Sequence, residues 1–158
     1  METAEFSRIA KQYTDIVYRA ALSCCKNKSD AEDAVQNTFY KLLQSNVEFE
    51  SDEHIRKWLI RVAVNECKSM WKSFWRKNVI SFDDLDKEPE YIESDKREIF
   101  NEMMKLPQNY SAVLHLYYYE GYSCNEIGSI LGISASNVQT RLLRARKMLK
   151  EKLKEAWI

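Results

Sequence analysis

The chain has 158 residues, of which 45% are hydrophobic, and its 24 basic and 24 acidic side chains give a formal net charge of zero. This composition supports a packed core and excludes a disordered chain. Only 3 glycines and 2 prolines are present, which disfavours a sheet-rich fold with many tight turns. No apolar run approaches the roughly 20 residues of a membrane-spanning helix, and the first residues lack the layout of a signal peptide. We therefore expect an all-α, cytoplasmic protein without membrane insertion, whose 4 cysteines are reduced thiols.

Charged residues are segregated along the chain. Acids predominate in residues 29–53 and 83–98, whereas bases predominate in residues 56–77 and after Gln139. Two basic blocks separated by acidic ones indicate two surfaces that face a polyanion and at least one that faces another partner. Ordinary solvated helix faces would give a similar distribution, so both interpretations stay open on this pattern alone.

Three stretches with the helical spacing of apolar residues predict a first small domain at residues 1–78. The first stretch contains Phe6, Ile9, Tyr13, Ile16, Val17 and Ala20, and the second contains Ala34, Val35, Thr38, Phe39 and Leu42. The third runs from about His54 to Trp75 and contains Ile55, Trp58, Leu59, Val62, Ala63 and Met70. We expect a capping box at Ser29–Glu32 to open the second helix.

Residues 79–94 have no apolar stripe and are rich in acids, so we interpret them as an acidic linker. A second helical domain is expected at residues 95–158. Pro107 allows one helix to end and another to begin, because proline is tolerated in a first turn but not inside a helix. Gly121 then ends the next apolar run.

The segment after Gly121 has the layout of a helix-turn-helix. Ser123–Glu126 forms a second capping box, Gly132 supplies the turn residue and Ser134 can cap the next helix, with Ile133 filling the corner. This spacing is typical of two crossed helices joined by a short turn, the motif that places its second helix in the major groove of DNA.

The second helix of this motif separates a buried stripe from an exposed face. At about 100° per residue, Val138, Leu142, Ala145 and Leu149 converge on the buried side. Hydroxyl groups and cations predominate on the other side, together with one leucine: Ser136, Thr140, Leu143, Arg144 and Lys147, with Gln139 at the edge. Hydroxyls and cations suit phosphates and base edges, and an apolar side chain can meet a thymine methyl. Leu143 has the alternative of being an ordinary exposed leucine.

Several segments together resemble the sigma-70 family of transcription factors. Residues 31–39, AEDAVQNTF, resemble the motif that binds core RNA polymerase, and residues 54–66, HIRKWLIRVAVNE, resemble the promoter-melting helix. Segments between Leu106 and Arg146 resemble the family's last domain, and the overall size is similar to that of extracytoplasmic-function (group IV) sigma factors. The family's usual Glu-Ile-Ala is here Glu-Ile-Gly, and Gly128 would allow the two crossing helices to pack more closely.

This resemblance implies three sets of contact residues. Core RNA polymerase would contact Asp30, Glu32, Asp33, Gln36 and Phe39. The melted −10 element of promoter DNA would contact Phe49, Arg61, Asn65, Glu66, Cys67, Lys68, Trp71 and Trp75, with Asn65 in the pocket for a flipped base. The duplex −35 element would contact Ser136, Gln139, Thr140, Arg141, Leu143, Arg144 and Lys147. Two alternatives stand beside these roles: the acids also complement a helix dipole, and Trp58 fits the core.

No pattern indicates an enzyme, a metal site or a cofactor. The histidines and cysteines show no paired spacing of metal ligands, and neither a catalytic triad nor a glycine-rich phosphate loop is present. The resemblance therefore predicts a sigma factor that recruits polymerase to promoters, and it leaves open whether an anti-sigma factor exists. The rivals are a stand-alone helix-turn-helix regulator, which needs no motif at Asp33–Gln36, and a sigma-like decoy that binds only protein.

Overall fold

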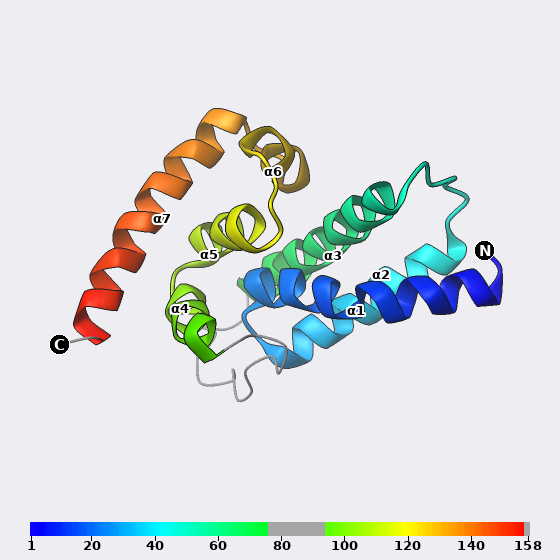
Figure 1. The fold of residues 1–158 in the computed structure, drawn as a ribbon, viewed down its shortest axis with the longest axis horizontal. Coiled ribbons are helices and arrows are strands. Elements are labelled where there is room, and N and C mark those ends of the chain that lie inside the picture. The colour runs from blue at the N-terminus through cyan, green and yellow to red at the C-terminus, as the bar shows by residue number, and fades with distance from the viewer. Residues whose placement is uncertain (76–93, 157–158) are drawn as a thin grey trace. The chain divides into compact units, whose positions relative to one another are not determined.

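The computed structural model describes the backbone of residues 1–75 and 94–156 and the side chains of residues 1–70 and 98–154. The described part is entirely helical, as expected, and no β-strand occurs in it (Figure 1). The chain divides into two compact units, Met1–Ile80 and Ser81–Ile158. The proposed linker at residues 79–94 lies outside the described residues except for Ser94, where a helix begins.

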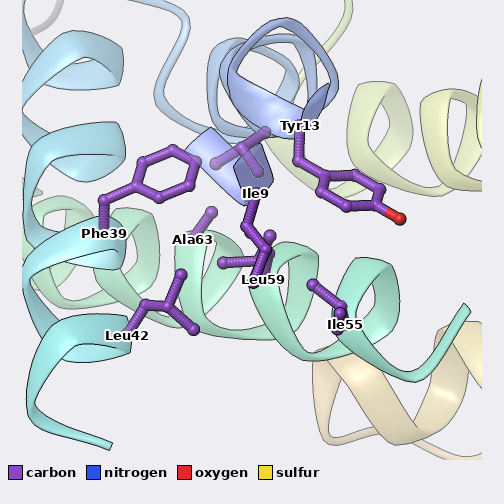
Figure 2. Packing of buried hydrophobic residues seen from close by; sticks show 8 residues of the cluster. Ile9, Tyr13, Phe39, Leu42, Ile55, Leu59 and Ala63 are labelled. Carbon is purple, nitrogen blue, oxygen red and sulfur yellow. The ribbon is translucent and has the colours of Figure 1, made fainter. Parts of the chain in front are cut away.

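The first unit is a bundle of three helices: α1 (Thr3–Cys25), α2 (Lys28–Gln44) and α3 (Asp52–Trp75). Apolar side chains from all three converge on one cluster (Figure 2): Ile9, Tyr13 and Val17 from α1, Phe39 and Leu42 from α2, and Ile55, Leu59 and Ala63 from α3. The predicted stripes thus form the core. Burying each large aliphatic side chain contributes roughly 1.5–3 kcal/mol, so this cluster holds the three helices in register.

The junction between α1 and α2 differs from the prediction in one respect. Helix α1 ends at Lys26, which is in the left-handed conformation with φ of 58° and is almost completely buried. Helix α2 begins two residues earlier than expected, because the side chain of Asn27 accepts a hydrogen bond from the backbone N–H of Asp30 at 3.1 Å. The predicted capping box at Ser29 is therefore wrong: Ser29 already lies inside the helix.

The second unit contains α4 (Ser94–Met104), α5 (Gln108–Leu114), the π-helix η2 (His115–Tyr119), α6 (Cys124–Leu131) and α7 (Ala135–Ala156). Pro107 stands directly before α5, and Gly121, with φ of 73°, follows the end of η2, so both predicted breaks are confirmed. The interior contains Phe100, Met103, Leu106, Val113, Leu116, Ile127, Val138 and Leu142.

A buried polar pair closes the π-helix. The imidazole Nε2 of His115 lies 3.1 Å from Oε1 of Glu120, and both side chains are at most 1% exposed. The ring of His115 also stacks on Tyr119, with centroids 5.4 Å apart. The wider turn of a π-helix brings residues five apart together, which is the separation of this pair.

None of the helices in the described residues combines the length and the apolar character that a bilayer crossing requires.

Candidate functional site

The helix-turn-helix of the second unit is built as predicted. The hydroxyl of Ser123 accepts from the backbone N–H of Glu126 at 3.1 Å, and the carboxylate of Glu126 accepts from the backbone N–H of Ser123 at 3.2 Å. This capping box fixes where α6 begins. Gly132 ends α6 with φ of 73°, a conformation that glycine adopts without steric cost, and the half-buried Ile133 lies at the corner.

Gly128 lies where the turn passes closest to α6. A Cβ atom built on Gly128 would be 2.6 Å from the carbonyl oxygen of Ile133 and 3.4 Å from the backbone nitrogen of Ala135. The space for an alanine is therefore occupied by backbone of the turn and of the first residue of α7. This supports the expectation that glycine at this position permits a closer approach of the two helices.

Helix α7 presents the exposed face that the helical wheel predicts. Its first turn is capped by Ser134, whose hydroxyl accepts from the backbone N–H of Asn137 at 3.1 Å. Val138, Leu142 and Ala145 are buried, whereas Leu149, predicted on the same stripe, is only half-buried. Six of the seven proposed −35 residues are exposed: Ser136, Gln139, Thr140, Leu143, Arg144 and Lys147. With 68% of its surface exposed, Leu143 is free to meet an apolar group of a ligand.

Two arginines of α7 are held by neighbouring side chains. The Nε atom of Arg141, the seventh proposed −35 residue, donates to Oδ1 of Asn137 at 3.1 Å, and the side chain of Arg141 is half-buried. Arg146 donates through Nε to the hydroxyl of Tyr118 at 2.6 Å and lies over the rings of Tyr117 and Tyr118, 5.4 and 5.5 Å from their centroids. These contacts direct Arg146 toward η2, a role that the charge pattern did not predict.

Beside Arg146, the second unit carries an apolar groove that sequence reasoning missed. Leu114, Tyr118, Leu149 and Leu153 line it, and Arg146, Lys150 and Lys154 also border it. Leu149 was assigned to the buried stripe because it follows the period of Leu142, but the second unit has no element that covers it in the described residues. The groove and the exposed face of α7 are separate surfaces of one helix.

The proposed polymerase-binding residues lie on α2 but not all at its surface. Glu32, Asp33 and Gln36 are exposed, and Asp33 and Gln36 are one turn apart. Asp30 is half-buried in the first turn, and its burial, together with the nearby Asp33 carboxylate, raises its pKa. The alternative that these acids complement the helix dipole is equally compatible with this geometry.

Phe39 requires a correction. Its ring is 8% exposed, belongs to the core cluster and packs edge-on against Phe6 with centroids 6.3 Å apart. It is therefore part of the core and does not face a partner. The exposed apolar side chains at this end of α2 are instead Tyr40 and Leu43, at 60% and 45% exposure, which follow Asp33 and Gln36 along the same side of the helix. Their spacing from Asp33 would have predicted this.

On α3, Arg61 and Asn65 are exposed and one turn apart, so both point away from the bundle on the same side. Phe49 lies at the other end of the helix, half-buried, with its ring edge-on to Trp58 at 5.7 Å and to His54 at 5.1 Å. Trp58 packs against the core cluster, which confirms its assignment to the core. The side chains of Trp71 and Trp75 lie outside the described residues.

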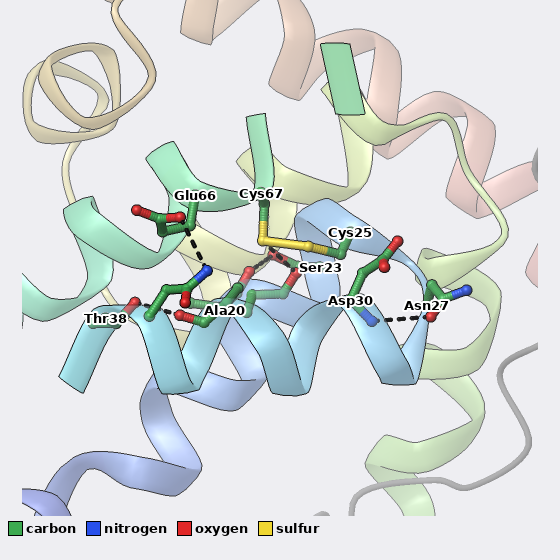
Figure 3. Close-up of a disulfide and its surroundings, with 11 residues drawn as sticks. Ala20, Ser23, Cys25, Asn27, Asp30, Thr38, Glu66 and Cys67 are labelled. Carbon is green, nitrogen blue, oxygen red and sulfur yellow. Dashed lines mark hydrogen bonds between the residues drawn. A yellow bond between two sulfur atoms is a disulfide. The ribbon is translucent and has the colours of Figure 1, made fainter. Parts of the chain in front are cut away.

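Glu66 and Cys67, the next two proposed −10 residues, are tied to the bundle (Figure 3). The carboxylate of Glu66 forms an ion pair with Lys41 and accepts from Nδ2 of Asn37 at 3.4 Å, both on α2. Cys67 is fully buried and forms a disulfide with Cys25, the last residue of α1. Lys68 is half-buried.

Two predictions about the cysteines are therefore corrected. Cys67 cannot contact DNA, because its sulfur is buried and bonded between α1 and α3. The four cysteines are not all reduced thiols, since only Cys24 and Cys124 are free. Among the described residues, no group of three or more histidine, cysteine, aspartate or glutamate side chains has an arrangement that could hold a metal ion.

Comparison with known families agrees with these two units. The profile of sigma-70 region 2 matches residues 9–77, and that of sigma-70 region 4 matches residues 96–149. The chain is 33% identical over 141 residues to the RNA polymerase sigma factor SigV of Bacillus subtilis, covering 86% of this chain and 83% of the relative. It is 31% identical over 151 residues to the extracytoplasmic-function sigma factor SigM of the same organism, covering 90% and 91%.

A solved structure has a similar fold. The sigma factor RpoE of Bartonella quintana, determined in complex with the anti-sigma factor NepR, superposes with a TM-score of 0.74 at 22% identity, over 95% of this chain and 97% of that one. At this level of identity the likeness concerns the fold.

Proposed function

The chain belongs to the sigma-70 family as an extracytoplasmic-function sigma factor, which binds core RNA polymerase and directs promoter-specific initiation, and we propose that its described surfaces divide this work by named residues. The exposed face of α7 reads the −35 element, Asn65 and Arg61 on α3 meet the melted −10 element, and Asp33 and Gln36 on α2 meet polymerase. The chain acts by binding and performs no covalent step itself. Work on polymerase and promoter DNA would place it in the cytoplasm.

The exposed face of α7 is the observation that carries this proposal. Its hydroxyl groups, leucine and two cations lie on the side opposite the buried stripe, with the amide of Gln139 at the edge, and the capping box, the Gly132 turn and the Ser134 cap set where α6 ends and α7 begins. Such a set supplies donors for phosphates and base edges and an apolar group for a thymine methyl.

The residue assignments are tested by separating closed-complex formation from promoter opening. Arg144→Ala should weaken closed complexes in a gel shift, either at one base position by roughly 1–3 kcal/mol or on all sequences alike if Arg144 meets a phosphate. Asn65→Ala should leave closed complexes unchanged and reduce the permanganate reactivity of thymines in the −10 element. The assignments are wrong if Arg144→Ala binds normally and Asn65→Ala opens promoters normally.

The polymerase face has its own test. Asp33→Arg reverses an exposed charge in the first half of α2 and should abolish the capture of core polymerase while leaving the circular dichroism spectrum unchanged. If the Asp33→Arg variant still captures core polymerase, Asp33 serves only to complement the helix dipole. The same pull-down separates a sigma factor from a stand-alone helix-turn-helix regulator, because the latter has no reason to bind core polymerase.

An anti-sigma factor is a further partner that we propose. The sigma factor RpoE, whose fold is similar, has been solved in complex with the anti-sigma factor NepR. In this chain, the apolar groove beside Leu149 and Leu153 offers a second protein a surface distinct from the DNA-reading face of α7. Leu153→Glu would test it: the variant should keep −35 binding and lose a co-expressed anti-sigma partner.

A further inference from the structure

Glu66 is the point at which α3 is joined to α2 by polar contacts. Its carboxylate receives an ion pair from Lys41 and a hydrogen bond from Nδ2 of Asn37 at 3.4 Å. The side chain of Glu66 is only 14% exposed, whereas that of Lys41 is 57% exposed. The carboxylate is thus turned toward the helix interface, away from the solvent where DNA would lie.

Both donors lie on one side of α2. Asn37 and Lys41 are four residues apart and so occupy successive turns of the same face. Gln36, which we assign to the polymerase surface, directly precedes Asn37 in the chain. Asn37 and Lys41, the two residues of α2 that contact Glu66, therefore lie next to the surface that would meet polymerase.

On α3, Glu66 and its neighbour Cys67 fix the backbone beside Asn65. Glu66 holds this turn to α2, and the disulfide from Cys67 to Cys25 holds it to α1 (Figure 3). Asn65 itself is exposed. The side chain that would receive a flipped base is thus carried by a turn that is attached to both other helices of the unit.

The energy of the Glu66 contacts depends on burial. An ion pair between two exposed side chains contributes little, because water screens it and both side chains lose freedom. Glu66 differs from that case, since it is largely withdrawn from water and accepts from two donors. Removal of either donor leaves a poorly solvated carboxylate, which costs more than an exposed pair would.

From these contacts we propose that Glu66 is a positioning residue for promoter opening, and that Lys41 and Asn37 link it to the polymerase-binding helix. It does not act as a DNA contact. This inference rests on the proposed role of Asn65 at the −10 element. When polymerase binds α2 and restricts its motion, the contact between Lys41 and Glu66 would also restrict the motion of the turn of α3 that carries Asn65.

A charge swap tests the link on the full chain with core polymerase. Lys41→Glu and Glu66→Lys each place like charges together and should slow promoter opening about tenfold, followed by permanganate reactivity over time. Closed-complex affinity should not change. The double variant Lys41→Glu/Glu66→Lys restores an opposite pair and should recover most of the opening rate, which neither a DNA contact at Glu66 nor a polymerase contact at Lys41 would allow.

Arg8→Glu is the matched control. It also reverses a cation that bridges two helices of the same unit, because Arg8 on α1 lies 3.6 Å from Asp52 at the start of α3, but neither residue is near Asn65 in the chain. This control should open promoters at the normal rate. Circular dichroism shows whether Glu66→Lys folds. If it does not, the single variants Glu66→Gln and Lys41→Met take the place of the two charge reversals, and each of them should slow promoter opening.

Each outcome decides between the possibilities. Single variants that open at the normal rate, or a double variant as slow as the singles, would overturn the positioning role. Asn65→Ala is run in parallel: normal opening by that variant would refute the assignment of Asn65. Slow opening by Asn65→Ala with normal opening by Glu66→Lys would refute only the link.

Discussion

In the oxidised protein, the disulfide between Cys25 and Cys67 should account for much of the stability of the first unit. The two cysteines are 42 residues apart in sequence, and the loop that they close contains all of α2 and the first two thirds of α3. Cross-linking a loop of this length removes chain entropy from the unfolded state and stabilises the fold by about 4 kcal/mol at 25 °C. Reduction, or Cys67→Ser, should lower the free energy of unfolding by about this amount.

The loss of loop closure should dominate this change in stability, because the reduced Cys67 still has a hydrogen-bond acceptor beside it. The sulfur of Cys67 lies 3.3 Å from the carbonyl oxygen of Ala21, so a thiol or a serine hydroxyl at this position can donate a hydrogen bond there. Neither leaves a buried donor unpaired, which would add a separate cost. Cys24 should not exchange with the disulfide near neutral pH, since burial raises the pKa of its thiol to about 11 and keeps it protonated.

Urea unfolding of the full chain followed by tryptophan fluorescence measures this effect. Three of the four tryptophans lie within the first 80 residues, so the signal reports mainly on that unit. With a slope of about 1–2 kcal/mol per molar urea, the midpoint should fall by roughly 2–4 M on reduction. Cys124→Ser, which removes a free thiol of the second unit, is the control and should leave this transition unchanged.

The reasoning would be refuted by one result in particular. If alkylation and mass measurement show that Cys25 and Cys67 are fully oxidised before and fully reduced after treatment, and the two forms unfold at the same urea concentration, loop closure does not contribute as argued. Cys25→Ser provides a second check, because it opens the same loop and should match Cys67→Ser closely.

Two further predictions concern single sites in each unit. Gly128→Ala should lower the Tm of the second unit by roughly 5–10 °C, because the strain of a Cβ placed 2.6 Å from the Ile133 carbonyl oxygen outweighs alanine's better helix propensity. Ser129→Ala, at an exposed position of α6, is the control and should change the Tm little when both variants are melted by circular dichroism. Burial lowers the pKa of Lys26 from 10.5 to about 7, so between these values the unfolded chain binds more protons than the folded one, and stability should rise with pH by at most about 1.4 kcal/mol per unit. Lys26→Met should be more stable than the wild type at pH 7 and should lose that advantage by pH 10 in urea titrations; an equal pH dependence in both proteins would contradict the assignment.

Features that depend on nearby residues were predictable from the sequence. Apolar stripes follow from helical periodicity, and the capping box at Ser123 needs only residues three apart. The N-terminus of α2 shows the limit of this reasoning, because Asn27 and Ser29 are both good capping residues and lie two positions apart. The structure selects Asn27, whose amide oxygen receives the Asp30 N–H.

Features that depend on how helices cross could not be predicted. Cys25 and Cys67 are far apart in sequence, and no spacing rule pairs them. Lys41 is the single base of one acidic block and Glu66 the single acid of one basic block, but nothing in the sequence pairs them until α2 and α3 are placed side by side. Phe39 satisfied both the buried stripe and the family's contact motif, and its burial among the core side chains, with Phe6 beside its ring, decides in favour of the core.

Residues 65–67 illustrate why binding and structural roles alternate on α3. Successive residues of a helix are rotated by about 100°, so three in a row point in three different directions. At this turn α3 packs against two neighbours, which leaves one direction for solvent: Asn65 takes it, Glu66 faces α2 and Cys67 faces α1. With the roles proposed above, a change at Asn65 should alter what the surface recognises without disturbing the bundle. Changes at the next two positions should act on recognition only through the orientation of Asn65.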